Sequence, residues 1–204
     1  MSYELKSARY LAREVLSQAI HAGDSAVDAT MGNGHDTLFL AEQVGPAGHV
    51  YAFDIQSGAV ESTRKLLESH GVLERVTLFC HSHEDLAQLV PSPVSAAVFN
   101  LGWLPGGDHR VTTRCASTEK AVRGALELIR PGGIVTVCAY PGHEEGDRER
   151  TMLISLLSGL SNRQYNVLRQ SFLNAGPGAP ECYVIQKSLY VPGTPGASVP
   201  HEST

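Results

Sequence analysis

The sequence predicts a doubly wound α/β domain whose mostly parallel, seven-stranded sheet ends in an antiparallel edge hairpin. Strand-like and helix-like segments alternate along the chain, which is typical of right-handed crossovers and of helices on both faces of a parallel sheet. Residues 94–100 are apolar almost throughout, as expected for a strand that is buried on both faces. The last two strand-like segments are joined only by the Gly- and Pro-containing stretch 175–180, which favours a hairpin.

The elements follow one another without an internal repeat or a domain break. Residues 1–21 are predicted to form a helix because their apolar side chains recur at helical spacing, and Gly23 ends it. The predicted strands span residues 25–30, 48–54, 76–80, 94–100, 134–140, 165–174 and 181–190, and the other predicted helices span 36–44, 58–70, 118–129 and 149–160. We therefore expect one domain over residues 1–190 and a mobile, Pro- and Gly-rich tail over 191–204.

The composition is that of an ordinary globular chain, because 42% of the 204 residues are apolar and 18% are charged. A net charge of −5 argues against a protein that grips a long nucleic-acid duplex, but it leaves room for a small RNA footprint. No apolar run approaches the ~20 residues of a membrane helix. The N-terminus mixes charged and apolar residues and does not resemble a secretory signal, so no membrane partner is predicted.

Cysteine usage indicates a reducing compartment. Cys80, Cys115, Cys138 and Cys182 are far apart, with no CxxC pair and no histidine at zinc-ligand spacing. We therefore expect buried, reduced thiols, no metal site and a cytoplasmic location.

The loop after the first predicted strand, residues 28–37, has the chemistry of a cofactor site. Gly32 and Gly34 lack a Cβ atom, so the backbone can turn sharply and approach a ligand closely, although a glycine pair is also common in plain turns. Asp28 ends the strand, where its carboxylate can pair with an ammonium group. Asp54 ends the next strand, where a carboxylate can accept hydrogen bonds from both hydroxyls of a ribose. These features favour S-adenosylmethionine (SAM) and a Rossmann-like methyltransferase fold.

A dinucleotide such as NAD is the nearest alternative cofactor. The dinucleotide fingerprint G-x-G-x-x-G has a third glycine where this chain has Thr37. Asp36 at the start of the helix would also repel a pyrophosphate held there. Ser82 and His83 follow the third strand, where an adenine ring would lie, although a histidine of a surface loop is nearly as good an interpretation of His83.

The segment after the fourth strand, residues 100–109, is the candidate reacting site. Asn100 and Trp103 have the spacing of the Asn and the aromatic residue in the N-P-P-[YF] tetrad of amino-group methyltransferases, although both prolines are missing. In that tetrad the Asn side-chain oxygen accepts a hydrogen bond from the target N–H. Such an acceptor would orient the nitrogen lone pair toward the methyl group, which is catalysis mainly by orientation.

An alkyl amine must lose a proton before it can attack, and Asp108 is the candidate base, with His109 as the second candidate. The alternative for Asp108 is structural, because Gly-Gly-Asp is also a common turn. The loop after the fifth strand borders the same cleft, so Tyr140 and His143 are expected to contact the substrate.

Cations near the candidate pocket could contact an RNA phosphate. Arg110 and Arg114 precede a helix that also carries Lys120 and Arg123. The alternative is that these side chains are merely solvated charges.

Three motifs in order resemble one known family. They are Asp28-Ala-Thr-x-Gly-x-Gly-x-Asp-Thr37, Asn100-Leu-Gly-x-Leu-Pro-Gly-Gly-Asp108 and Tyr140-x-Gly-His-x-x-Gly146. The chain is similar over about residues 5–190 to the small bacterial SAM-dependent enzymes long labelled "putative rRNA methylase", now associated with wobble uridine in tRNA. The resemblance implies a class I SAM methyltransferase that converts 5-aminomethyl-2-thiouridine to 5-methylaminomethyl-2-thiouridine in the tRNA anticodon stem-loop.

The resemblance also implies residue roles. It assigns SAM binding to Asn33, Asp36, Asp54, Gln56, Ser82 and His83, and it places Asn100, Asp108 and Tyr140 against the uridine. Trp103 stands where the family is expected to have tyrosine, which preserves stacking. A homodimer is consistent with the size of such enzymes. Methylation of rRNA or of a small amine, an NAD-dependent oxidoreductase and a non-catalytic SAM- or RNA-binding module are the alternatives.

Overall fold

The computed structural model describes residues 8–91, 93–103, 112–176 and 178–189. Its seven strands form one sheet in the order β3-β2-β1-β4-β5-β7-β6. The strands are β1 Ser25–Asp28, β2 His49–Asp54, β3 Val76–Cys80, β4 Val94–Asn100, β5 Ile129–Ala139, β6 Tyr165–Gln170 and β7 Glu181–Lys187. Strands β1 to β5 pair in parallel, whereas β7 pairs antiparallel with both β5 and β6, so the predicted sheet and its edge hairpin are confirmed.

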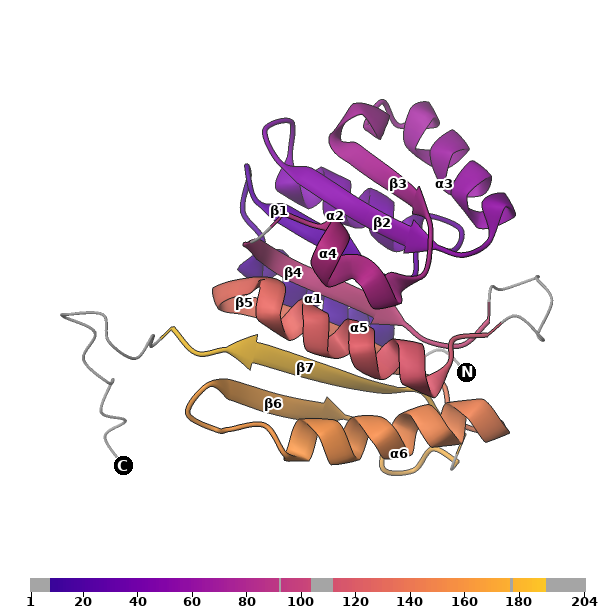
Figure 1. The fold of residues 1–204 in the computed structure, drawn as a ribbon, viewed down its shortest axis with the longest axis vertical. Coiled ribbons are helices and arrows are strands. Elements are labelled where there is room, and N and C mark those ends of the chain that lie inside the picture. Colours follow the sequence, from indigo (N-terminus) through magenta and orange to yellow (C-terminus); the bar gives the residue numbers. More distant parts are fainter. Residues whose placement is uncertain (1–7, 92, 104–111, 177, 190–204) are drawn as a thin grey trace.

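Helices cover both faces of the sheet (Figure 1). The helices are α1 Ala8–Ala19, α2 His35–Val44, α3 Ser57–Ser69, α4 Leu86–Leu89, α5 Cys115–Leu128 and α6 Glu144–Ser158. One buried cluster joins the sheet to side chains of α1, α2 and α3, and the other joins it to side chains of α4, α5 and α6. Because the sheet is covered on both sides, β4 is buried along six of its seven residues, as its apolar sequence predicts.

Several element boundaries differ from the prediction. Helix α6 begins at Glu144 rather than 149, because His143 caps it by accepting a hydrogen bond from Gly146 N and acidic residues favour a first turn. Strand β5 begins at Ile129, which pairs with Val94 before the register shifts. The short helix α4 is not predicted, since a single helical turn has too few residues to show a period.

Cys138 and Cys182 are buried free thiols, as predicted, and face each other across β5 and β7. The prediction is wrong for Cys80, which is exposed at the end of β3, and for Cys115, which is partly exposed at the start of α5. The predicted tail, residues 191–204, lies outside the described residues, and the one-domain boundary stays a prediction. Within the described ranges, no helix is long and apolar enough to cross a membrane.

The strand order places the site. Strand β1 pairs in parallel with β2 on one side and with β4 on the other, so the direction of winding reverses between β1 and β4. In doubly wound sheets, ligands bind at the carboxyl ends of the strands at this reversal.

Candidate functional site

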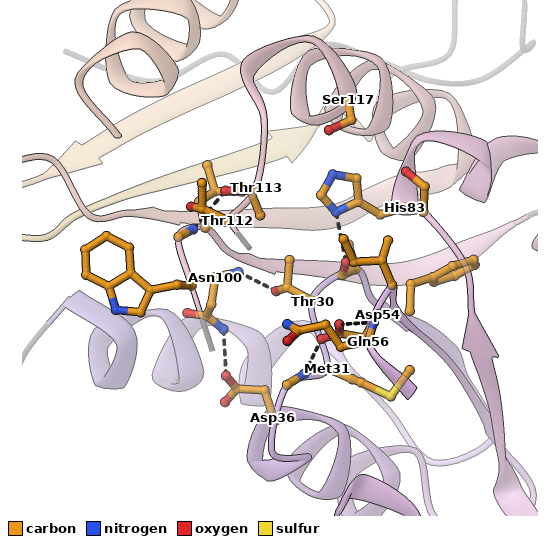
Figure 2. Close-up of a pocket in the computed structure, with 18 of the residues that line it drawn as sticks. Thr30, Met31, Asp36, Asp54, Gln56, His83, Asn100, Thr112, Thr113 and Ser117 are labelled. Atoms are coloured by element: carbon orange, nitrogen blue, oxygen red, sulfur yellow. Dashed lines mark hydrogen bonds between the residues drawn. The ribbon is translucent and has the colours of Figure 1, made fainter. Parts of the chain in front are cut away.

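A cavity of about 560 Å³ lies at the carboxyl ends of β1, β2 and β4, which is the size of a small-molecule or cofactor site. Most of the predicted site residues that the structure describes line this cavity. They are Gly32, Asn33, Asp36, Asp54, Gln56, Ser82, His83, Asn100, Trp103, Arg114, Tyr140 and His143. The close-up in Figure 2 shows Asp54, His83 and Asn100 gathered from three different segments of the chain.

Three predicted cofactor residues do not reach the cavity. The Asp28 side chain is fully buried and accepts hydrogen bonds from Thr30 N (3.1 Å) and Thr37 Oγ1 (2.7 Å). Thr37 is likewise fully buried. Gly34 has a φ of 82° and packs against α3, where an added Cβ would lie 2.9 Å from Thr63 Oγ1. Asp28, Gly34 and Thr37 therefore support the loop without lining the cavity, and their direct contact with the cofactor stays a prediction.

The burial of Asp28 has an electrostatic consequence. Desolvation, with a smaller contribution from the negative charge of Asp36, raises the pKa of the Asp28 carboxyl from 3.8 to about 7. A carboxyl group with this pKa is a poor permanent partner for an ammonium group at neutral pH. Its structural role is to tie the start of the loop to the first turn of α2.

Asp54 ends β2 and joins two loops at the cavity wall. Its Oδ2 accepts a hydrogen bond from Gly32 N (3.1 Å), and its Oδ1 accepts one from Gln56 N (2.9 Å) (Figure 2). Each carboxylate oxygen has a second lone pair, so the group can still accept hydrogen bonds from a ribose. The geometry therefore fits the predicted role of Asp54.

Ser82 and His83 follow β3, at the same cavity. The Ser82 hydroxyl accepts a hydrogen bond from Glu84 N and caps a turn of 3₁₀ helix. The ring of His83 is buried rather than on a loop surface, with its Nδ1 3.0 Å from Ala29 O. Burial lowers the pKa of His83, so the ring is neutral at physiological pH and can face a flat apolar group.

Asn100 is the last residue of β4, and both of its nitrogens are held. Its backbone N donates to Thr30 Oγ1 (2.7 Å), and its side-chain Nδ2 donates to Asp36 Oδ2 (2.7 Å). Its Oδ1 is buried and has no hydrogen-bond partner among the described residues. Figure 2 shows the amide nitrogen turned toward Asp36 and the oxygen turned away from it. The structure thus leaves a buried acceptor unused on a residue that lines the cavity.

Aromatic side chains also line the cavity. The rings of Trp103 and His143 are 4.6 Å apart at 50°, and Trp103 is 36% exposed. Tyr140, at the end of β5, also lines the cavity, and burial raises its pKa to about 12. These rings form a wall against which a planar group can pack.

Residues 102–103, which follow β4, are joined to residues 112–113, which precede α5. Trp103 and Thr112 form an isolated antiparallel bridge, and the Thr113 hydroxyl accepts from Gly102 N (2.8 Å). The same hydroxyl donates to the buried Glu149 carboxylate (2.9 Å), whose pKa is raised by burial. The sequence analysis missed Thr113 and Glu149, since their pairing joins two segments 36 residues apart. The predicted residues Asp108, His109 and Arg110 lie outside the described residues.

Among the described residues of the predicted basic patch, Arg114 lines the cavity and Lys120 and Arg123 do not. Arg114 is exposed. Lys120 instead pairs with Asp85 and Arg123 with Glu119, so these two cations are partly neutralised. Arg9 of α1 is a cavity residue that the sequence analysis missed, and it lies one helical turn from Arg13 on the same face.

Comparison with known proteins gives a family. The family model described as "Putative rRNA methylase" matches residues 50–186. The "tRNA (mnm(5)s(2)U34)-methyltransferase, chloroplastic" of Arabidopsis thaliana is 37% identical in an alignment of 179 residues that covers 83% of this chain and 65% of the plant protein. The chain thus spans just under two thirds of the length of that relative.

Two solved structures of bacterial proteins resemble the chain over nearly its whole length. A "putative rRNA-methylase" from Clostridium thermocellum is 37% identical, covers 91% of this chain and 100% of its own, and superposes with a TM-score of 0.88. A "putative methyltransferase" from Streptococcus mutans, in complex with S-adenosylhomocysteine (SAH), is 34% identical, covers 90% and 99%, and has a TM-score of 0.82. Together with the sheet order, these matches favour the methyltransferase fold over a dinucleotide-dependent oxidoreductase. The chain belongs to the "Putative rRNA methylase" family, a family of SAM-dependent methyltransferases with the class I α/β fold.

Proposed function

We propose that this chain is a SAM-dependent N-methyltransferase that acts on the aminomethyl group of 5-aminomethyl-2-thiouridine at the wobble position of tRNA. Its product would be 5-methylaminomethyl-2-thiouridine. The name of the Arabidopsis relative, which specifies mnm(5)s(2)U34 in tRNA, supports this choice of substrate.

The observation that carries the proposal is the unused acceptor of Asn100. A buried polar atom without a partner costs about 1–3 kcal/mol, so it is usually retained for a ligand or a water molecule. Here the atom is Oδ1, a pure acceptor, and it belongs to a residue that lines the cavity together with Trp103 and Tyr140. An amine offers the N–H donor that such an oxygen requires, and a pyrimidine ring offers a face to the aromatic wall.

The cavity residues divide into two groups. Gly32, Asn33, Asp54, Gln56 and His83 would hold the cofactor, with Asp54 accepting from the ribose and His83 beside the adenine. When bound, SAM supplies an electrophilic methyl group on a sulfonium. Asn100 would accept a hydrogen bond from the amine and hold its lone pair toward that methyl group, which contributes to rate mainly through orientation. Asp108 stays our proposed acceptor of the amine proton.

The partner that fits the charge of the chain is a compact RNA element. Arg114 at the rim of the cavity can contact a phosphate, whereas the net charge of −5 disfavours a long duplex. We therefore propose the tRNA anticodon stem-loop as the partner. The cytoplasmic location and the homodimer stay predictions.

A methyl-transfer assay tests the proposal. Purified protein and SAM are incubated with bulk tRNA from a strain that lacks this gene, and nucleosides are quantified by mass spectrometry. We expect 5-aminomethyl-2-thiouridine to be converted to its N-methyl product. If SAH binds but no tRNA nucleoside changes, the substrate assignment is wrong, and rRNA and small amines become the acceptors to test. If neither SAM nor SAH binds, the proposed activity is wrong.

A further inference from the structure

Asp36 lies at the start of α2, where three donors from other parts of the chain meet its carboxylate. Arg9 Nε is 3.0 Å from Oδ2, Arg13 Nε is 2.8 Å from Oδ1, and Asn100 Nδ2 is 2.7 Å from Oδ2. The residue is only 7% exposed. A carboxylate so occupied has little capacity left for a ligand, which disagrees with the direct cofactor contact that the sequence predicts for Asp36.

The contact with Asn100 fixes the direction of an amide. A carboxylate accepts hydrogen bonds but donates none, so only the NH₂ end of the Asn100 amide can face Asp36. The oxygen must then point away from Asp36, and this is the oxygen that has no partner among the described residues. Without the carboxylate, nothing on that side would distinguish the two ends of the amide, which have nearly the same shape.

Helix α1 keeps the carboxylate in place. Arg13 donates from Nη2 to His35 O (2.8 Å) as well as to Asp36, and its guanidinium lies 5.0 Å from the centre of the Phe39 ring. Arg13 is therefore held by three groups of α2, and Arg9 approaches the other carboxylate oxygen. The planar guanidinium groups restrict how Asp36 can turn.

We propose that Asp36 is a positioning residue that, held by Arg9 and Arg13, forces Asn100 to present an acceptor to the substrate amine. This inference rests on the proposed function, in which Asn100 Oδ1 receives the amine N–H. It assigns α1 a part in turnover. It also predicts substrate selectivity. An amide oxygen fixed in this direction favours substrates whose methylated group carries an N–H donor.

The direct test is Asp36→Asn, which keeps the shape but allows the Asn100 amide to turn over. The readouts are kcat and KM for methyl transfer to tRNA that carries 5-aminomethyl-2-thiouridine, the Kd of SAH by calorimetry, and the melting temperature. We expect kcat to fall on the order of tenfold to a hundredfold, as for a misplaced reacting group, with the Kd of SAH within about twofold of wild type.

Asp24→Asn is the matched control. Asp24 also pairs with an arginine, Arg130 (3.2 Å), but it precedes β1, at the end of that strand opposite to the cavity. This variant should keep both kcat and the SAH affinity. If Asp36→Asn does not fold, Arg13→Gln is the second variant. It removes one of the two arginines that donate to Asp36, and it is also expected to lower kcat.

A double-mutant cycle separates this inference from a general structural effect. In an Asn100→Ala background, Asp36→Asn should have no further effect on kcat, because Asp36 would act only through the Asn100 amide. Equal loss in both backgrounds would overturn the proposal. So would a weaker SAH affinity with unchanged kcat at saturating SAM, which would make Asp36 a cofactor residue. A wild-type enzyme that is inactive on this tRNA would instead refute the proposed function.

Discussion

Replacing Asp28 by Asn tests how the loop beneath the cavity is built. The Asp28 carboxyl is fully buried, and its pKa is raised from 3.8 to about 7, mainly by desolvation. Asn has almost the same shape and can still accept from Thr30 N, while the Thr37 hydroxyl can turn to accept from the new NH₂ group. The variant therefore removes the ionisation of this site and little else.

The expected effect depends on pH in a defined way. Because the folded protein binds this proton more tightly than the unfolded chain does, the stability that the neutral carboxyl contributes is fully present below pH ~4 and is lost as the pH rises through about 7. A shift of about three pKa units at 1.36 kcal/mol per unit gives a loss of about 4 kcal/mol. Asp28→Asn should escape this loss.

The assay is urea unfolding of both proteins at several pH values between 4 and 8. The free energy of unfolding of the variant minus that of wild type should increase by about 1.4 kcal/mol for each pH unit across most of this range. The values at pH 4 are the internal control, since both proteins then carry a neutral group, and the other titrations cancel in the difference. Parallel curves would refute the raised pKa. A loss of SAH affinity greater than tenfold in a stable variant would restore the direct cofactor contact.

Three further changes test other parts of the site. Asp54→Ala should weaken SAH binding by about 1–3 kcal/mol, because it leaves hydrogen-bonding groups without partners, and calorimetry that finds unchanged affinity would remove Asp54 from the site. Thr113→Val should lower the free energy of unfolding by about 1–3 kcal/mol, because Gly102 N and a buried carboxylate lose their shared partner. The control Thr151→Val loses only an exposed hydrogen bond to a helix carbonyl. If both variants lose the same free energy of unfolding in urea, the two hydrogen bonds of Thr113 do not stabilise the fold as proposed. Arg114→Ala should raise the KM for tRNA and flatten its salt dependence at unchanged SAH affinity, and equal salt slopes would make Arg114 a bystander.

Local patterns were enough to predict the fold. The alternation of segments, the apolar run at 94–100 and the glycine-containing loop after β1 determine a doubly wound sheet, and the sheet order then brings the loop ends together. The same rule predicted that Asp54, His83 and Asn100 would meet at one cavity, although they are distant in the sequence. The family motifs pointed to the same segments.

The sequence could not show which polar side chains face the cavity and which face one another. Asp28 and Asp36 are both acidic residues of one glycine-containing loop, yet one is buried beneath it and the other is held by two arginines of α1. Likewise, the sequence pattern places Glu149 on a helix surface. In the structure its buried carboxylate accepts hydrogen bonds from Thr113 and Thr118 and so ties α6 to the start of α5.

The difference has a physical cause. Secondary structure and strand order follow from the period of apolar residues and from short-range backbone preferences, which every segment carries in its own sequence. The partner of a buried polar group is instead chosen by packing between segments far apart in the chain, because such a group must find a donor or acceptor wherever the fold brings one. The sequence alone thus determined the architecture, the cofactor class and the strand ends at which the cavity lies, whereas the tertiary structure decided that the Asn100 amide donates to Asp36 and leaves its oxygen without a partner among the described residues.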